Sequence, residues 1–217
     1  MPGTTPVYGF PYPEPTDLVA DYPALGQDLA EDIEAVLPTL GGLNLATPTS
    51  IANSGGSASL SGNTVTFTTV SSVSLNGCFT STYTNYRVLV NLTARSNIST
   101  DLLMRMRASG TDNTATSYAR SQVFSVYSGT TISVNNNATA GNYFFLSFPP
   151  ADTSSRAIDV MAPQAAARTF IQSNCGNQDS WSLAMGNHDS TTSFDGFTIY
   201  ISAGTISGSV AVYGFKK

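Results

Sequence analysis

The stretch YRVLVNLTAR at residues 86–95 decides the fold, because large apolar and other side chains alternate along it. Successive side chains of a β-strand point to opposite faces of the sheet, so this alternation gathers the large apolar groups on one face. That face carries Tyr86, Val88, Val90 and Leu92. One covered face and one solvent face are typical of a strand in an antiparallel sheet.

The stretch LLMRMRAS at residues 102–109 repeats the pattern with larger side chains. The positions expected to face the core are Leu102, Met104, Met106 and Ala108. The positions expected on the opposite face are Leu103, Arg105 and Arg107. A second strand with one apolar face indicates that the two stretches cover a common core.

Strand-like runs continue to the C-terminus and are separated by clusters of turn-forming residues such as SGTDN, NNNATAGN and GNHD. The further runs lie at about 64–70, 73–79, 118–127, 143–148, 156–162, 168–173, 181–185, 194–201 and 206–215. Some ten or eleven short strands without an intervening helix predict an all-β head over residues 64–217, built as a β-sandwich or jelly roll.

Residues 1–20 differ from the head, because five prolines interrupt them. Proline at this density opposes a regular helix and favours an extended, polyproline-like course. The aromatic side chains Tyr8, Phe10 and Tyr12 stand between the prolines. Two interpretations stay open: a disordered tail, or an extended segment whose aromatic groups dock into grooves of a partner.

A short helix is expected next, over DYPALGQDLAEDIEAVL at residues 21–37, with Asp21 as N-cap. Its apolar stripe consists of Tyr22, Leu25, Leu29, Ile33 and Val36. Either the chain's own domain or further copies of the helix around a threefold axis can cover this stripe, and we favour self-association. The expected organisation is an attachment arm with a helix (1–40), a Gly/Ser-rich linker (41–63) and the head.

Charge is sparse and uneven. Only 11% of the residues are charged and the formal net charge is -5, which argues against nucleic acid as a partner. Residues 1–86 hold seven acidic residues and no Lys or Arg, whereas residues 87–217 hold seven acidic and nine basic residues. The two parts of the chain are therefore expected to have different roles.

No basic segment precedes an apolar run near the N-terminus, and no apolar stretch is long enough to span a membrane. We therefore expect a protein without a signal peptide or membrane insertion. The two cysteines, Cys78 and Cys175, are too few and too far apart for a disulfide scaffold or a zinc site. They are expected to be buried thiols, or alternatively to form a single disulfide.

Motifs of catalysis are scarce. The single histidine, His188, lies in GNHDS without a nucleophile-elbow pattern, and no close pair of acidic residues suggests glycoside hydrolysis. The pairs Asp112-Asn113 and Asn187-Asp189 offer oxygen ligands for calcium but are first expected to form Asx turns. No nucleotide-binding glycine motif is present. We expect no catalytic residue, no metal and no cofactor.

Aromatic side chains beside amide and carboxylate groups are the remaining candidates for binding. Such surfaces stack on the apolar face of a sugar and hydrogen-bond its hydroxyl groups. Tyr118 and Trp181 border loops and are the best candidates, with Asp112 and Asn113 beside them.

Several stretches resemble structural proteins of bacteriophage particles. The opening TTPVYGFPYP with a short acidic helix resembles the N-terminus of minor tail or fibre proteins in phages of actinobacteria. FTSTYTNYRVLV at 79–90, LLMRMRASGTDNTATSY at 102–118 and the closing FTIYISAGTISGSVAVYGFKK resemble the terminal β domain of phage fibre and virion surface proteins.

The resemblance implies a non-enzymatic virion protein, made in the host cytoplasm and assembled as a homotrimer. Residues 1–40 would dock to other virion proteins, and the head would present a glycan-binding surface to the host as in a tail fibre. A capsid decoration or head-fibre protein is the alternative, and a polysaccharide depolymerase is a less favoured third.

Overall fold

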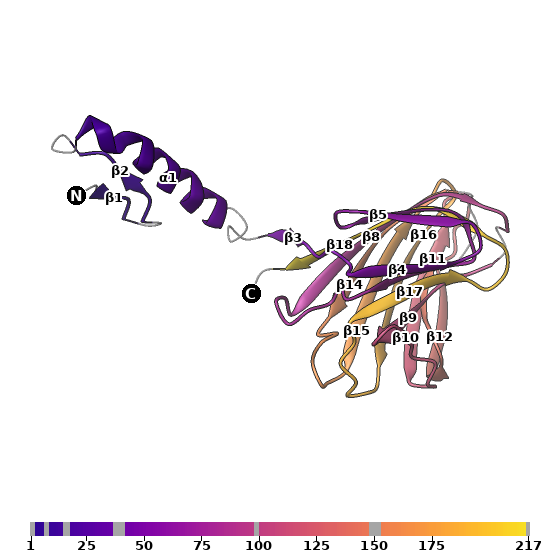
Figure 1. Cartoon of the computed structure of the whole chain (residues 1–217). Helices are drawn as coiled ribbons and strands as arrows, with labels where there is room; N and C mark the ends of the chain where they lie inside the picture. The colour runs from indigo at the N-terminus through magenta and orange to yellow at the C-terminus, as the bar shows by residue number, and fades with distance from the viewer. Residues whose placement is uncertain are drawn as a thin grey trace. The chain divides into compact units, whose positions relative to one another are not determined.

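The computed structural model describes residues 3–6, 9–14, 18–36, 42–97, 100–147 and 153–215. The chain divides into two compact units, of which the first ends at Gly42 and the second begins at Leu43 (Figure 1). No helix among the described residues is both long and apolar enough to cross a membrane. The boundary lies two residues from the predicted end of the attachment arm.

A small hairpin begins the first unit. Strands β1 (Gly3–Thr4) and β2 (Pro11–Tyr12) pair in antiparallel fashion. The backbone N–H of Thr5 donates to the carbonyl of Phe10 at 2.9 Å, and the N–H of Phe10 donates to the Thr5 hydroxyl at 2.9 Å. The two strands are locally extended, but these hydrogen bonds fold the arm back on itself, so it does not follow a single polyproline-like course.

The helix follows the expected range closely. The 3₁₀ turn η1 (Val19–Asp21) leads directly into α1 (Tyr22–Val36), so Asp21 ends a 3₁₀ turn. Leu25 is the buried residue of the helix, and it lines an apolar depression of about 210 Å³ with Pro11 and Pro13. The chain's own proline arm thus covers part of the apolar stripe.

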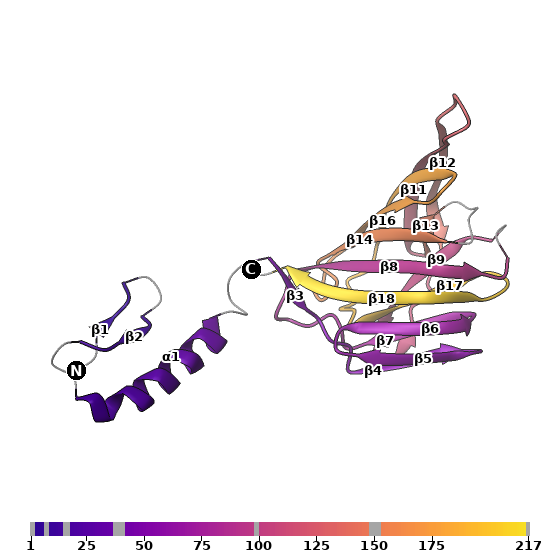
Figure 2. The same cartoon turned by 90° about the horizontal axis from the view of Figure 1, so that it is seen from above.

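The second unit contains a ten-stranded sheet, referred to below as the large sheet (Figure 2). Its strands, in spatial order, are β12 (Ser133–Gly141), β11 (Tyr118–Val126), β16 (Ser180–His188), β15 (Thr169–Gly176), β14 (Ser154–Met161), β8 (Asn85–Arg95), β18 (Ile206–Phe215), β6 (Thr64–Val70) and β5 (Ser57–Ser61), with β3 (Leu43–Leu45) also paired with β18.

A six-stranded sheet, the small sheet, packs against the large one to form a β-sandwich (Figure 1). Its strands are β10 (Thr111–Asp112), β9 (Leu102–Ala108), β17 (Gly196–Ile201), β7 (Ser72–Asn76) and β4 (Ser50–Ser54), with β13 (Phe144–Ser147) also paired with β9. Every described strand pair is antiparallel. The predicted all-β sandwich head is confirmed.

The core lies between the two sheets and uses the alternation seen in the sequence. Seven of the eight residues of β8 and β9 expected to face the core are buried in it: Tyr86, Val88, Val90, Leu92, Leu102, Met104 and Met106. The eighth, Ala108, is half-buried and packs against the core. The opposite face of β9 is not simply exposed, since Leu103 and Arg107 are also buried. Leu103 pairs with the buried Phe145 of β13, so the prediction of a half-buried strand is wrong there.

The predicted linker over residues 41–63 is also wrong, because β3, β4 and β5 belong to the two sheets. Ile51, Ala58 and Leu60 pack against the core at alternate positions of these strands. The region predicted as a turn around NNNATAGN is likewise strand β12, paired with β11. Small and polar side chains suit strands at the edge of a sheet, where only part of each strand is covered.

Candidate functional site

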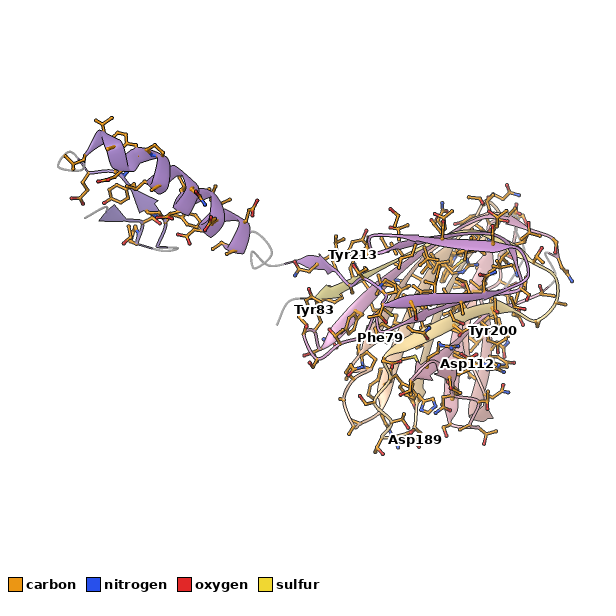
Figure 3. All side chains as sticks on the ribbon, in the orientation of Figure 1. Phe79, Tyr83, Asp112, Asp189, Tyr200 and Tyr213 are labelled. Atoms are coloured by element: carbon orange, nitrogen blue, oxygen red, sulfur yellow. The ribbon has the colours of Figure 1, made fainter. Side chains whose placement is uncertain are left out.

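The outer face of the small sheet carries a regular row of polar side chains. Thr198 on β17 lies opposite Arg105 on β9 and opposite Ser74 on β7. The adjacent positions on the same three strands, Leu75, Met106 and Phe197, are buried in the core. The two sets therefore occupy opposite faces, and the polar set lines an open depression of about 480 Å³. Figure 3 marks this region by Asp112 and Tyr200.

Arg107 is the hub of a hydrogen-bond network beside the depression. Its guanidinium donates to Asn76 Oδ1 (2.8 Å), Thr198 Oγ1 (2.9 Å), Ser74 Oγ (3.1 Å), Asp112 Oδ1 and the carbonyl oxygen of Gly110. Thr198 in turn donates to Asp112 Oδ1 at 2.6 Å. The network compensates the charge of Arg107 and holds the side chains of Arg107 and Asp112 in fixed positions.

Arg105 has different surroundings from Arg107. Its Nε donates to the carbonyl oxygen of Asn142 at 3.0 Å, and its guanidinium carbon lies 4.7 Å from the centre of the Tyr200 ring. Burial raises the pKa of Tyr200 to about 12, against the opposing effect of Arg105. The Tyr200 hydroxyl therefore remains protonated at neutral pH and is able to donate a hydrogen bond.

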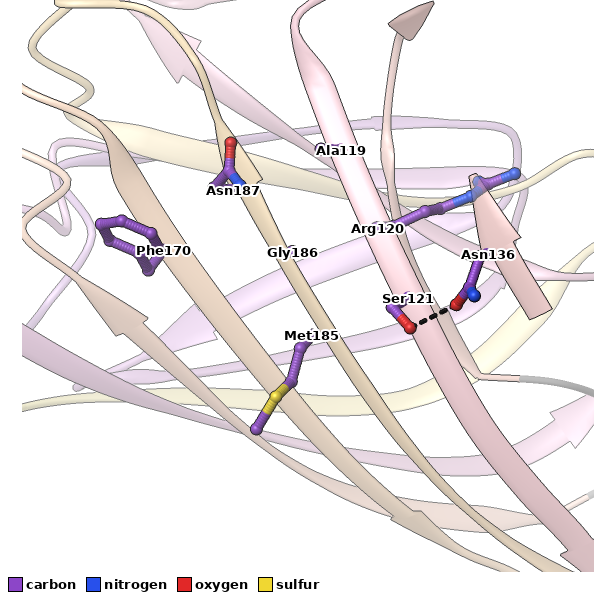
Figure 4. Close-up of a pocket in the computed structure, with 8 residues that line it drawn as sticks. All are labelled: Ala119, Arg120, Ser121, Asn136, Phe170, Met185, Gly186 and Asn187. Atoms are coloured by element: carbon purple, nitrogen blue, oxygen red, sulfur yellow. Dashed lines mark hydrogen bonds between the residues drawn. The ribbon is translucent and has the colours of Figure 1, made fainter. Parts of the chain in front are cut away.

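A second depression, of about 510 Å³, lies on the outer face of the large sheet (Figure 4). Phe170 and Met185 line it and are 48% and 50% exposed. On its other side, Ser121 of β11 donates a hydrogen bond to Asn136 of β12. Trp181 is 36% exposed and lies on the same face of β16 as Met185. This face is more apolar than the outer face of the small sheet.

The four predicted glycan-binding residues do not form one site. The prediction for Tyr118 is wrong, because its ring is fully buried and packs edge-on against Phe144. Its hydroxyl donates to the carbonyl of Asn113 at 2.8 Å. Asn113 also accepts a hydrogen bond from the backbone N–H of Ala115, as in an Asx turn. Only Asp112 lines the polar depression.

Trp181 and Asp112 lie on different sheets, so they cannot contact one small ligand together. The polar depression instead brings together residues that the sequence analysis did not nominate, chiefly Arg105, Thr198 and Tyr200. The alternation of LLMRMRAS did place both arginines opposite the core positions. That pattern was the available signal for this site.

The cysteine and histidine side chains lie inside the head. Cys78 and Cys175 are both buried and both free, as the interpretation of buried thiols expects. His188 is fully buried between the rings of Tyr118 and Phe194, at centroid distances of 4.3 and 4.9 Å. Burial lowers the pKa of His188, with a smaller opposing effect from Asp189.

The predicted docking residues belong to the first unit. Tyr8 lies outside the described residues, Tyr12 is 45% exposed, and the backbone of Phe10 closes the hairpin. Along the predicted stripe of α1, Leu25 is buried, Leu29 and Val36 are half-buried, and Tyr22 and Ile33 are exposed.

No family model and no curated protein matches this chain. Among solved structures, the carbohydrate recognition domain of Emp47p is 8% identical, with 78% of this chain and 90% of that chain covered and a TM-score of 0.24. The laminarinase catalytic domains of Thermotoga petrophila and Thermotoga maritima are 11% and 10% identical, each with 77% of both chains covered, at TM-scores of 0.22 and 0.23. Likenesses at this level carry no argument about function.

Proposed function

We propose that this chain is a structural protein of a bacteriophage particle, of the tail-fibre or receptor-binding type, whose β head binds glycan on the host surface. The polar depression on the outer face of the small sheet carries this proposal. Its hydroxyl and guanidinium groups sit on neighbouring strands of one sheet, and a rigid support of this kind favours precise recognition of sugar hydroxyl groups.

The hydrogen bonds that Asp112 accepts support binding rather than hydrolysis at this depression. One carboxylate oxygen, Oδ1, accepts hydrogen bonds from both Arg107 and Thr198. Glycoside hydrolysis commonly uses two carboxyl groups, one of which must exchange a proton with the substrate. A carboxylate that is paired with a guanidinium is better suited to hold the geometry of a binding surface.

The first unit is proposed to attach the head to other virion proteins through residues 1–40. All seven acidic residues of the first 86 positions precede residue 35, and no Lys or Arg balances them. We expect a virion partner with a basic surface, because opposite charges steer association. The exposed Ile33 offers an apolar contact for a homotrimer, in which repulsion between the acidic units is expected to weaken as salt rises.

A capsid decoration protein is the second candidate, and the large sheet favours it. The exposed Phe170, Met185 and Trp181 lie on one outer face, which suits packing on another protein such as a shell subunit. Labelling the protein in intact particles distinguishes the candidates, since a signal at the tail supports the first and a signal over the capsid face supports the second.

The glycan-binding role is tested with the purified full chain and host cells. We expect fluorescently labelled protein to bind the cells and to compete with adsorption of particles that carry it. Enzymatic removal of surface polysaccharide should abolish the binding. Cell binding that survives this removal would contradict a glycan receptor.

A further inference from the structure

We infer that the polar depression of the small sheet selects saccharides that carry a carboxylate or phosphate group, with Arg105 as the anion-binding residue. This inference rests on the proposed glycan-binding function and names the class of glycan. It depends on three features of the depression: its charge, the donors that remain on Arg105, and the hydroxyl groups around them.

The charge balance differs between the two arginines that line the depression. Arg107 is compensated by Asp112 in the network described above. The other ion pairs recorded among the described residues are Arg87 with Asp159 and Arg168 with Asp189. Arg105 thus takes part in no ion pair within the described part of the chain, and its positive charge is available to a ligand.

The donor groups of Arg105 fit a planar anion. Within the described residues its guanidinium donates from Nε to the carbonyl oxygen of Asn142, and neither Nη donates a hydrogen bond. Two parallel N–H groups match the two oxygens of a carboxylate or phosphate. The contact with the Tyr200 ring holds the guanidinium in place, which reduces the conformational entropy lost on binding.

The rest of the depression suits the neutral part of a sugar. The hydroxyl-bearing residues Ser54, Ser71, Ser72 and Tyr200 line it from three strands and one loop, and the Ser71 hydroxyl donates to the carbonyl oxygen of Ser54 at 3.2 Å. Burial, which is the largest effect, raises the pKa of Tyr200 to about 12, so its hydroxyl stays protonated and can donate a hydrogen bond to a sugar oxygen. One anionic contact surrounded by hydroxyl groups describes an acidic sugar better than a neutral one or a simple ion.

The test measures binding of the purified full chain to four polymers by calorimetry. Polygalacturonate supplies carboxylates, poly(ribitol phosphate) supplies phosphates, dextran is a neutral saccharide, and polyglutamate is an anion without sugar. We expect one or both acidic saccharides to bind, and the stronger of the two identifies the anion. The substitution Arg105→Met should weaken that binding roughly 10- to 100-fold, as expected for loss of a charged, bidentate contact.

Arg168→Met is the matched control, because it removes the same charge from an exposed ion pair elsewhere on the head and should change binding less than about twofold. Arg105→Lys keeps the charge without the paired donors and should recover only part of the affinity. Equal binding of dextran with no effect of Arg105→Met would overturn the inference and leave glycan binding intact. Equal binding of polyglutamate would also overturn the inference, because the depression would then not select saccharides. If no saccharide binds, the proposed function fails as well.

Discussion

Replacing His188 by Leu should change the pH dependence of stability in a way that only this residue explains. His188 is the single histidine of the chain and is fully buried against two aromatic rings. Neither ring nitrogen has a hydrogen-bond partner among the described residues. A protonated imidazole in this position would be a buried charge that Asp189 offsets only in part, which is why burial lowers the pKa of His188 in the folded state.

The sign and size of the effect follow from the protons bound in each state. The unfolded chain takes up a proton near the ordinary pKa of 6.5, whereas folded His188 takes it up only at lower pH. Well above pH 6.5, where the imidazole is neutral in both states, the residue contributes nothing to the pH dependence. As the pH falls from 6.5 to the folded-state pKa, it lowers the free energy of unfolding by at most about 1.4 kcal/mol for each pH unit.

Urea unfolding of the wild type and His188→Leu, measured from pH 7.5 to pH 5, provides the assay. The difference between the two curves is expected to level off near pH 7.5 and to change in favour of the variant as the pH falls through 6.5 toward 5. The variant itself should be less stable at pH 7.5, since it loses the ring contacts with Tyr118 and Phe194. Parallel curves over the whole range, or a histidine NMR signal that titrates at 6.5, would refute the reasoning.

Three further predictions concern the head and its boundary. Gly208→Val should lower the free energy of unfolding by about 3 kcal/mol in urea titrations, because an added Cβ would lie 2.1 Å from the carbonyl oxygen of Asn91; a shift below 0.5 kcal/mol contradicts this. Cys78 and Cys175 should resist a thiol reagent in the native protein and both react in denaturant, and prompt native reaction would show that they are accessible. Deletion of residues 1–42 should preserve the β-rich circular dichroism spectrum and one cooperative transition, since Leu43–Phe215 is a separate compact unit; loss of both would place essential contacts in the deleted part.

Alternation predicted the central strands well, because these strands have one face in the core. In β8 and β18 almost every second side chain is buried, and the predicted ranges agree with the structure to within a few residues. The helix was equally accessible, since its stripe and its flanking prolines and glycines are local signals. The residue order of such an element is sufficient to predict it.

The edge strands carried no comparable signal. β4 and β5 consist largely of Ser, Ala and Asn, so their composition resembles that of a flexible linker. They are strands because β7 and β6 offer backbone donors and acceptors over their whole length, through pairings such as Ile51 with Leu75. This contribution comes from a distant segment, and it does not appear in the composition of the edge strand itself.

The candidate site shows the same division between local and distant information. Tyr118 borders a loop in the sequence, yet it lies opposite His188 of the neighbouring strand β16, and both side chains are buried. Proximity to a loop therefore predicts the exposure of a side chain poorly. The phase of a strand, meaning which of its alternate positions face the core, predicts that exposure well. That phase placed Arg105 opposite the core, but only the register with β17 brings Thr198 beside it and Tyr200 under its guanidinium. A binding surface on a sheet is thus specified jointly by phase, which one strand reveals, and by register, which requires its partners.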